Sequence, residues 1–206
     1  IHKLNLSSDY YKAISDLQKY PGKETEDVLL NFIKLKSTDE SVKIAKRKAV
    51  EVLASFDCKT GVNTIAQCLD SQDPYLVETA AFALVKLNCD EPRIIDKLIN
   101  LLDDHTQNRR SLVQALSKLR DIGQLKKMKE ILKERELNIG IRGAIISCLV
   151  KVGGEKYCTK ELVNNLYSDN QNTRYSAAYD IIGSGDITLL PYVLRTPVSP
   201  FIRITA

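Results

Sequence analysis

The segment Ala80-Ala81-Phe82-Ala83-Leu84-Val85-Lys86-Leu87 decides the fold of this chain. It places a small residue first, a branched apolar residue four positions later and another apolar residue three positions further on, which is the spacing of one buried helix face. The same spacing of small and apolar residues recurs at Ala49/Leu53/Phe56, Leu112/Leu116/Leu119, Ile145/Leu149/Val152 and Ala177/Ile181/Ser184. The middle members lie 31, 32, 33 and 32 residues apart. This nearly constant period predicts an array of helical repeats.

A second apolar pattern precedes each of these segments, so the predicted repeat has two helices. It covers residues 28–33, 62–69, 94–102, 125–132 and 162–166. Short polar residues and glycines fall where two-helix units need turns. The residues expected to cap the second helices are Asp39, Asp73, Asn108 and Asn172, and those expected to end them are Gly153-Gly154 and Gly183-Ser184-Gly185. Because no Asn-Gly or Asp-Gly turn and no long alternating run of β-branched residues occurs, strands are not expected.

The predicted fold is all-α: a HEAT-like α-solenoid, forming a right-handed superhelix of about five to six helical hairpins. The signature residues of tetratricopeptide and ankyrin repeats do not occur. We expect a single repeat domain over 1–206, in which residues 1–22 form an N-terminal cap helix and residues 23–206 form the repeats, the last of them incomplete. Each hairpin of such an array buries its apolar stripe against its neighbours.

The composition is that of an ordinary globular protein. Of the 206 residues, 44% are apolar and 27% are charged, which excludes a disordered tail or a fibrous protein. The longest nearly apolar run, residues 144–150, is far shorter than the roughly 20 residues that cross a bilayer. The first residues show no secretory leader pattern, so we expect an intracellular protein. The five cysteines form no CxxC motif, which favours reduced, buried thiols.

Positive charge is concentrated in the middle of the chain. Residues 109–151 contain eleven Lys and Arg against four Asp and Glu, a net charge of +7, whereas the whole chain carries +4. An anionic ligand or partner facing this region is therefore expected. The Lys-rich stretch 126–135 also fits a nucleic-acid surface, but its interleaved glutamates favour a solvated helix face. His2 and His105 are the only histidines and form no HExxH motif, so no metal site is expected.

Several local sequences are more specific than the repeat period. The most diagnostic are Asp73-Pro74-Tyr75-Leu76-Val77-Glu78 and Arg195-Thr196-Pro197-Val198-Ser199-Pro200, with residues 109–116, 141–144 and 172–182 between them in order. Together they resemble the E subunits of E/F-type phycobilin lyases over about residues 39–206.

The resemblance implies an enzyme that binds a linear tetrapyrrole, or phycobilin, and attaches it through a thioether to a cysteine of a phycobiliprotein. It implies a heterodimer with an F-type lyase subunit and a phycobiliprotein subunit as protein substrate. The phycobilin is then substrate rather than a tightly bound cofactor, and neither a metal, nor nucleic acid, nor a membrane span is involved. The expected location is the cytoplasm of a cyanobacterial-type cell or the stroma of a plastid.

The residues give this resemblance a chemical interpretation. Four arginines lie six or seven positions before the core residue of three successive repeats, and we expect them to form a ladder that binds the two propionates of a bilin. These arginines are Arg109, Arg110, Arg142 and Arg174. Flat apolar area for the pigment would come from Tyr75, Tyr175 and Tyr179, together with Phe82. Asp180 and Glu78 are the expected catalytic residues, which hydrogen-bond or protonate pyrrole nitrogens.

Each assignment has an alternative that the sequence leaves open. The arginines would also fit an ion-pair stack that joins successive repeats, with Asp73, Asp103, Asp104 or Asp169 as partners. The tyrosines would also fit core or rim packing, and Glu78 and Asp180 would fit surface charges. The alternative function is a non-catalytic HEAT-repeat scaffold for protein assembly, and a more distant one is a nucleic-acid glycosylase.

Overall fold

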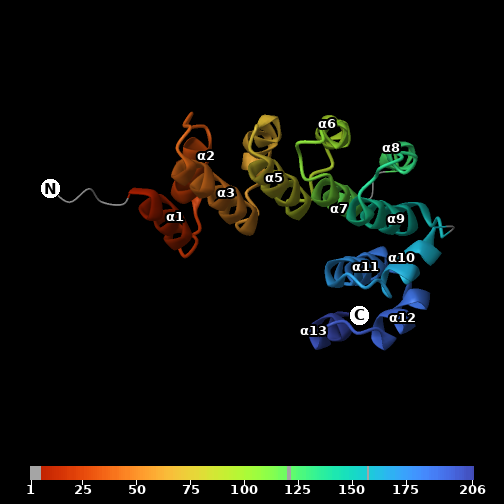
Figure 1. Cartoon of the computed structure of the whole chain (residues 1–206). Helices are drawn as coiled ribbons and strands as arrows, with labels where there is room; N and C mark the ends of the chain where they lie inside the picture. The colour runs from red at the N-terminus through yellow and green to blue at the C-terminus, as the bar shows by residue number, and fades with distance from the viewer. Residues whose placement is uncertain (1–5, 120–121, 157) are drawn as a thin grey trace. The chain divides into compact units, whose positions relative to one another are not determined.

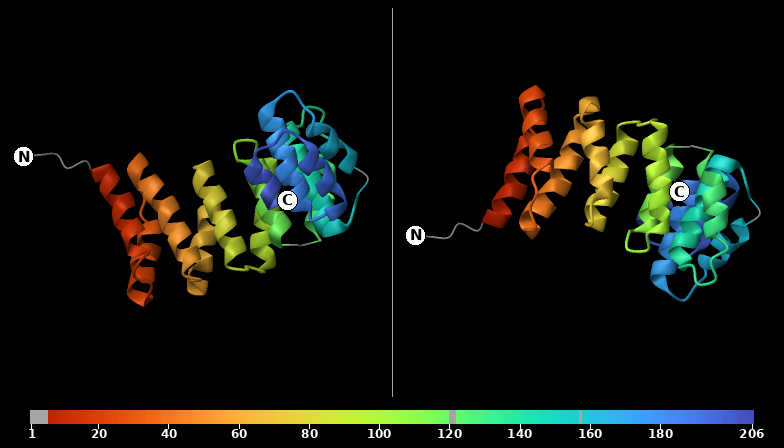
Figure 2. Two further views of the ribbon diagram at one scale, coloured as in Figure 1. Left: turned by 90° about the horizontal axis from the view of Figure 1, so that it is seen from below. Right: turned by 90° about the horizontal axis from the view of Figure 1, so that it is seen from above.

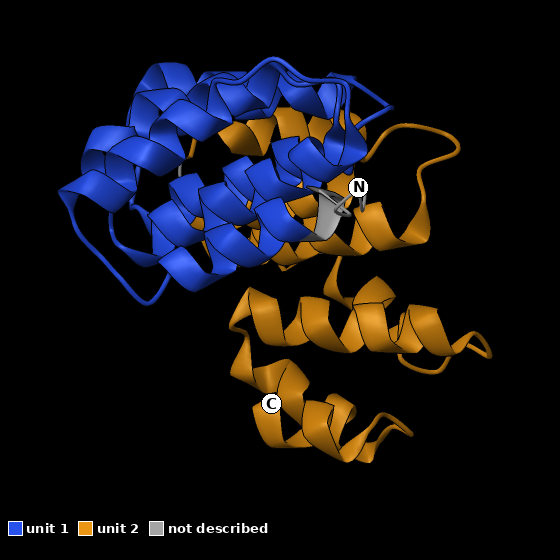
Figure 3. Cartoon of the chain, turned by 90° about the vertical axis from the view of Figure 1, so that its left-hand side faces the viewer, with its two compact units in different colours: residues 1–108 blue, residues 109–206 orange. Residues whose placement is uncertain are grey.

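The computed structural model describes residues 6–119, 122–156 and 158–206, and every regular element in these ranges is helical (Figure 1). The chain divides into two compact units, residues 1–108 and 109–206 (Figure 3). The prediction of an all-α fold is confirmed for these residues. The prediction of one repeat domain over the whole chain stays a prediction.

The described part of unit 1, residues 6–108, contains six α-helices. They are α1 (Leu6–Leu17), α2 (Lys23–Ile33), α3 (Glu40–Ser55), α4 (Val62–Gln67), α5 (Pro74–Lys86) and α6 (Pro92–Asn100), with short 3-10 turns at Lys59–Gly61, Cys68–Asp70 and Leu101–Asp103. Helices α1, α3 and α5 lie side by side in that order (Figures 1 and 2), while α2 packs on α3 and α4 packs on α5. Helix α1, which packs on α3, lies within residues 1–22, where the sequence predicts an N-terminal cap helix.

Unit 2 continues the alternation of helices. It contains α7 (Arg109–Leu119), α8 (Gln124–Ile131), α9 (Ile139–Gly153), α10 (Thr159–Asn165), α11 (Gln171–Ser184), a 3-10 turn at Ile187–Leu189, α12 (Leu190–Arg195) and α13 (Pro200–Thr205). Helix α9 packs against both α7 and α11, and α8 and α10 pack on α9. Helices α12 and α13 pack on α11. The residues that the sequence analysis assigns to an incomplete last repeat form α12 and α13, and the incompleteness itself stays a prediction.

The repeat period corresponds to the core. The middle members of the repeat pattern are among the most deeply buried residues of α3, α5, α7, α9 and α11, with exposed fractions of 0% or 1%: Leu53, Leu84, Leu116, Leu149 and Ile181. Burying one such side chain stabilises a fold by about 1.5–3 kcal/mol. The pattern read from the sequence is therefore the face that each of these helices packs against its neighbours.

Of the helix caps predicted from the sequence, two are confirmed and one is wrong. The carboxylates of Asp39 and Asp73 accept backbone hydrogen bonds at the starts of α3 and α5. The expected cap at Asn172 is wrong, because α11 begins at Gln171 and its cap is Asn170, whose side chain accepts from Thr173 N at 3.1 Å. Helix α9 is capped by Asn138. None of the described helices is long and apolar enough to cross a membrane.

Two glycines end second helices in a left-handed conformation, as predicted: Gly154 has φ 67° and Gly185 has φ 71°. A side chain in this conformation is strained, so we expect Gly154→Ala and Gly185→Ala each to lower the free energy of unfolding by about 1 kcal/mol. Urea unfolding followed by circular dichroism measures this. Gly22→Ala is the matched control, since Gly22 has extended backbone and a Cβ added to it would meet no atom within 4 Å, and an equal loss there would contradict the prediction.

Candidate functional site

The predicted site residues fall into two groups, one in each unit. Tyr75 and Glu78 lie on α5 of unit 1. The others lie on the three packed helices of unit 2, with Arg109 and Arg110 on α7, Arg142 on α9, and Arg174, Tyr175, Tyr179 and Asp180 on α11.

The first group lines a groove between α3 and α5, with a volume of about 580 Å³. This volume lies in the range of small-molecule sites. Tyr75, Glu78 and Phe82 follow the i, i+3, i+7 spacing of one helix face, which brings all three to the groove. The full lining is Arg47, Glu51, Ala54, Tyr75, Glu78, Thr79, Phe82, Ala83 and Lys86. We call this surface the α3–α5 groove.

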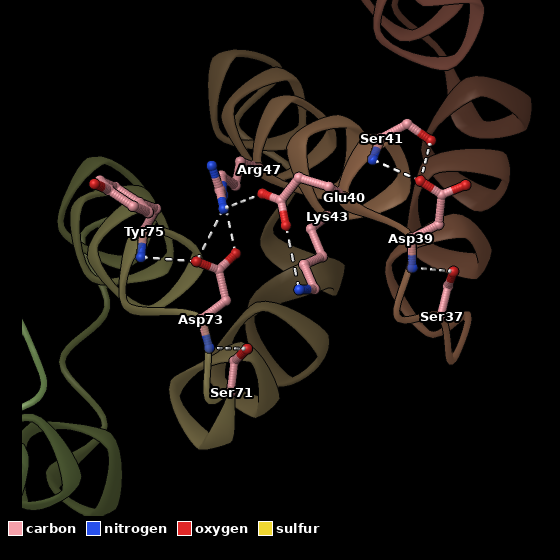
Figure 4. Close-up of polar contacts among 9 residues, drawn as sticks. All are labelled: Ser37, Asp39, Glu40, Ser41, Lys43, Arg47, Ser71, Asp73 and Tyr75. Atoms are coloured by element: carbon pink, nitrogen blue, oxygen red, sulfur yellow. Dashed lines mark hydrogen bonds and ion pairs between the residues drawn. The ribbon is translucent and has the colours of Figure 1, made fainter. Parts of the chain in front are cut away.

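Arg47, which lines the groove, has its guanidinium held by two carboxylates. Arg47 donates to both carboxylate oxygens of Asp73, at 2.9 and 3.0 Å, and also reaches Glu40 at 3.3 Å (Figure 4). Its Cζ lies 4.8 Å from the centre of the Tyr75 ring, within the range of a cation–π contact. Since Asp73 also caps α5 through Tyr75 N, one carboxylate positions both the helix and the arginine.

Arg47 is not among the residues predicted from the sequence, although a signal for it exists. It stands six residues before Leu53, the same position that Arg110 takes before Leu116. Glu78, the second predicted residue of this group, is half-buried and accepts a hydrogen bond from Asn108 Nδ2 at 3.0 Å. Tyr75 is 64% exposed.

In unit 2 a buried ion pair joins α7 to α11. Both terminal nitrogens of Arg110 donate to Asp180, at 2.7 and 3.0 Å, and Arg110 also donates to the carbonyl of Gly140 at the start of α9. Asp180 is only 4% exposed. The carboxylate of Asp180 lies against α9 at Gly143. A Cβ atom added to Gly143 would lie 2.5 Å from Asp180 Oδ2. Glycine at this position leaves the room that the carboxylate occupies.

The environment of Asp180 changes its acidity. Burial raises the pKa of this carboxyl to about 6, and the neighbouring Arg110 guanidinium opposes the rise without cancelling it. Because the unfolded chain has the ordinary pKa of 3.8, the folded protein binds this proton more tightly. A raised carboxyl pKa contributes stability that is complete below about pH 4 and is lost as the pH rises through about 6.

This acidity predicts a specific pH dependence. We expect the free energy of unfolding of the unmodified chain, minus that of Asp180→Asn, to fall by up to about 3 kcal/mol between pH 4 and pH 7. Subtraction removes the contributions of other carboxylates, such as Asp186, whose pKa is lowered by hydrogen bonds from Lys156 and Thr188. Urea unfolding of both proteins across this range gives the difference. A difference that is flat, or that rises with pH, would contradict the prediction.

The other three arginines of the predicted ladder also have protein partners. Arg109 is 5% exposed and donates to both oxygens of Glu134, at 2.6 and 3.0 Å. Arg142 pairs with Glu161 at 2.8 Å and donates to Leu132 O. Arg174 donates to the carbonyls of Ser168 and Asp169. Contact between a ligand and Arg109 or Arg110 would require an ion pair to open, whereas Arg142 is one-third exposed.

The two tyrosines of α11 have different surroundings. Tyr175 packs partly against the apolar core of unit 2, and its hydroxyl accepts from Gln171 at 2.9 Å. Tyr179 is 45% exposed. Of the two, Tyr179 has the larger surface left for a ligand.

The thiols of the chain are poorly suited to nucleophilic chemistry. None of the five cysteines forms a disulfide bond, and Cys58, Cys68, Cys89 and Cys148 are buried, as predicted. Burial raises the pKa of Cys68 and of Cys148 to about 11. Since the thiolate is the nucleophile, these two cysteines are largely unreactive near neutral pH.

Comparison with known proteins agrees with the architecture. A family of HEAT repeats matches residues 26–117. The chain has a HEAT-repeat fold. This fold is also similar to a solved structure of the complex of CpcE and CpcF of phycocyanin lyase from Nostoc sp. PCC7120, with a TM-score of 0.77, 20% identity, and coverage of 99% of this chain and 81% of that chain.

Two curated proteins are similar to this HEAT-repeat chain over nearly its whole length. Bilin biosynthesis protein CpeY of Synechococcus sp. (strain WH8020) is 36% identical over 202 residues, which cover 97% of this chain and 47% of that protein. Uncharacterized phycocyanin operon protein Y of Pseudanabaena tenuis (strain PCC 7409) is 26% identical over 194 residues, 94% of this chain and 46% of that protein. The resemblance to phycobilin lyases is confirmed, and the chain spans about half the length of these curated relatives.

Proposed function

We propose that this chain acts in a phycobilin lyase, where it binds a linear tetrapyrrole and promotes its attachment to a cysteine of a phycobiliprotein. The observation that carries the proposal is the 36% identity to bilin biosynthesis protein CpeY over 97% of the chain. The HEAT-repeat fold shared with the CpcE and CpcF complex supports it, because that complex belongs to a phycocyanin lyase.

The proposed chemistry is the addition of a thiol to a double bond of the pigment. A carbon–sulfur bond forms and the S–H bond breaks, and the proton passes to the pigment, so no oxidant or reductant is consumed. The thiol comes from the phycobiliprotein, which agrees with the buried cysteines of this chain. The work left to the chain is to hold the pigment extended, to orient it and to move a proton.

We assign the proton-handling roles as predicted from the sequence, to Glu78 and Asp180. The position of Glu78 on the α3–α5 groove supports contact with pyrrole nitrogens. The pKa of Asp180, about 6, suits proton transfer near neutral pH, but its two oxygens are already engaged by Arg110. Glu78 is therefore the better placed of the two. Of the four arginines predicted to bind propionates, Arg142 and Arg174 are the more available, because Arg109 and Arg110 each hold both oxygens of a carboxylate of the chain itself.

The proposed partners are an F-type lyase subunit and a phycobiliprotein subunit. The bilin is their common substrate and is not a resident cofactor. The proposed location is where phycobiliproteins are assembled, in the cytoplasm of a cyanobacterial-type cell or in the stroma of a plastid. The second candidate function is a non-catalytic scaffold, which is favoured by the arginines of unit 2 that are used in ion pairs within the fold.

Coexpression tests this function. The chain, candidate F-type subunits and a phycobiliprotein subunit are produced in a cell that makes phycoerythrobilin or phycocyanobilin, and covalent pigment is detected by zinc-enhanced fluorescence on a denaturing gel. Pigment on the phycobiliprotein that depends on the chain is the expected result. The control is an acceptor whose cysteines are replaced by alanine. Attachment at the same rate without the chain would overturn the lyase proposal, and stable assembly without a change in the bilin spectrum would favour the scaffold.

A further inference from the structure

We propose that the α3–α5 groove binds the bilin, with the ring of Tyr75 as a stacking surface, Arg47 as the residue that positions this ring, and Lys86 as the partner of a pigment carboxylate. The inference rests on the proposed function for the identity of the ligand. The site itself is built from unit 1 alone. It adds two residues, Arg47 and Lys86, that the resemblance did not single out.

The first support is that an exposed aromatic ring is held in place. Tyr75 is 64% exposed, and an exposed ring without contacts would sample several orientations. The Arg47 guanidinium lies 4.8 Å from the ring centre, and Arg47 is itself held by Asp73 and Glu40 (Figure 4). Although Arg47 contacts the Tyr75 ring, most of Tyr75 remains exposed. This exposed surface is available to a flat conjugated ligand. A ring that is ordered before binding loses less entropy when the ligand arrives.

The second support is the charge at the other end of the groove. Lys86, in the last turn of α5, is exposed, and among the described residues no carboxylate lies within ion-pair distance of its ammonium. The other cation of the groove, Arg47, is engaged by Asp73, and Glu51 is paired with Lys48. The carboxylate of a ligand in the groove would therefore pair with Lys86. Glu78 lies between Tyr75 and Lys86 on α5 and would face the pyrrole nitrogens of the pigment.

The third support is the size and alignment of the site. Tyr75, Phe82 and Lys86 are spaced i, i+7 and i+11 on α5, so they lie on one face of the helix. The first and last of them are about 16 Å apart along the helix axis. The groove volume of about 580 Å³ suits an extended ligand of drug-like size. A planar pigment lying along α5 would meet an aromatic ring, an apolar centre and a cation in turn.

Equilibrium binding of free bilin to the full chain, followed by visible absorbance, tests the site. Tyr75→Ala is expected to weaken binding roughly tenfold, whereas Tyr75→Phe, which keeps the ring, leaves it nearly unchanged. Tyr20→Ala is the matched control, since Tyr20 is 67% exposed and does not line the groove. Equal losses in Tyr75→Ala and Tyr20→Ala would overturn the stacking role.

The role of Lys86 is tested with a chemical probe. The unmodified chain is expected to bind the free acid of the bilin roughly tenfold more tightly than its dimethyl ester, and Lys86→Met is expected to bind both equally. Lys12→Met, which removes an exposed lysine of α1, should retain the preference. A preference that persists in Lys86→Met would overturn the assignment of the carboxylate.

The positioning role of Arg47 requires a readout that general stability does not change. Arg47→Lys keeps a cation opposite Asp73 but removes the planar group from the ring, and it is expected to weaken bilin binding several-fold. In the Tyr75→Ala background the same change should have no further effect, because the ring is gone. Equal effects in both backgrounds would show that Arg47 does not act through Tyr75 and would overturn its role.

The outcomes separate this inference from the function on which it rests. If the chain binds bilin and all groove variants bind it equally well, the site lies elsewhere and only the further inference fails. If the unmodified chain leaves the bilin spectrum unchanged at every concentration, both fail. Groove variants that keep bilin affinity but lose retention of a phycobiliprotein subunit would assign the groove to a peptide and would likewise overturn the inference.

Discussion

Asp180→Ala is expected to lower the free energy of unfolding by about 2–4 kcal/mol at pH 7. The change leaves the Arg110 guanidinium without the two carboxylate oxygens that it contacts at 2.7 and 3.0 Å. Arg110 is 22% exposed, so water replaces only part of what is lost, and an uncompensated charge inside a fold is costly. Urea unfolding followed by circular dichroism measures the loss.

A double variant identifies the origin of this loss. Arg110→Met combined with Asp180→Ala removes both charges, and it is expected to cost clearly less than the sum of the two single changes, because neither charge is then left unpaired. Arg93→Met, at an exposed arginine paired with Glu91, is the control and should change stability by less than about 1 kcal/mol. If the losses of unfolding free energy from the single changes at Arg110 and Asp180 simply add in the double variant, the ion pair does not stabilise unit 2.

Gly143→Ala is expected to destabilise the chain by about 2–4 kcal/mol, although alanine is normally the better helix former. The added Cβ would lie 2.5 Å from Asp180 Oδ2. The carboxylate of Asp180 can move away from this Cβ only by giving up its contacts with Arg110. The substitution therefore breaks the ion pair between Arg110 and Asp180 without changing either residue. The unfolding midpoint in urea reports the effect.

The sign of the Gly143 effect should reverse when Asp180 is absent. In the Asp180→Ala background the Cβ of residue 143 meets no carboxylate, and the nearest remaining atom outside α9 is Leu162 Cδ2 at 3.5 Å, an ordinary contact. Gly143→Ala should then stabilise the chain by up to about 1 kcal/mol, the usual difference between the two residues in a helix. A loss of stability of the same size in both backgrounds would mean that the cost comes from elsewhere in α9.

The sequence predicts the helices well because the repeat period is a property of local spacing. Leu53, Leu84, Leu116, Leu149 and Ile181 are buried in successive second helices, as their 31–33-residue spacing indicates. The one misplaced cap, Asn172, lies two residues beyond the true cap Asn170. Asn170 and Asn172 are the same residue type and lie two positions apart, so residue preference cannot choose between them as the cap. Only the position at which the α11 backbone begins distinguishes them.

The candidate site is less predictable because side-chain partners depend on tertiary contacts. Asp180 and Arg110 are 70 residues apart in the chain, and nothing local indicates that they meet across α9. From the sequence, Asp180 was assigned to the pigment and Arg110 to a propionate, but in unit 2 each is the partner of the other. Gly143 is the local signal, since a glycine inside a helix often marks a place where another group approaches the helix backbone closely. Only the folded unit shows that this group is the Asp180 carboxylate.

The groove residues show the opposite case. Tyr75, Glu78 and Phe82 were selected from the sequence and do lie together on one surface, because helix geometry alone brings i, i+3 and i+7 to one face. Arg47 comes from the preceding second helix and repeats the position of Arg110 relative to its core leucine. Aligning all five repeats by their middle residue, rather than only the last three, would have found it.

The link from α7 to α11 has a consequence for how unit 2 comes apart. In a linear array each member touches only the next one, so the array can fray one member at a time from an exposed end. A contact that skips over the central member removes this freedom, since α11 cannot detach without exposing a guanidinium held on α7. Amide exchange in α7, α9 and α11 is therefore expected to proceed through one shared opening event, and in Asp180→Ala the protection should decline gradually from α11 toward α7.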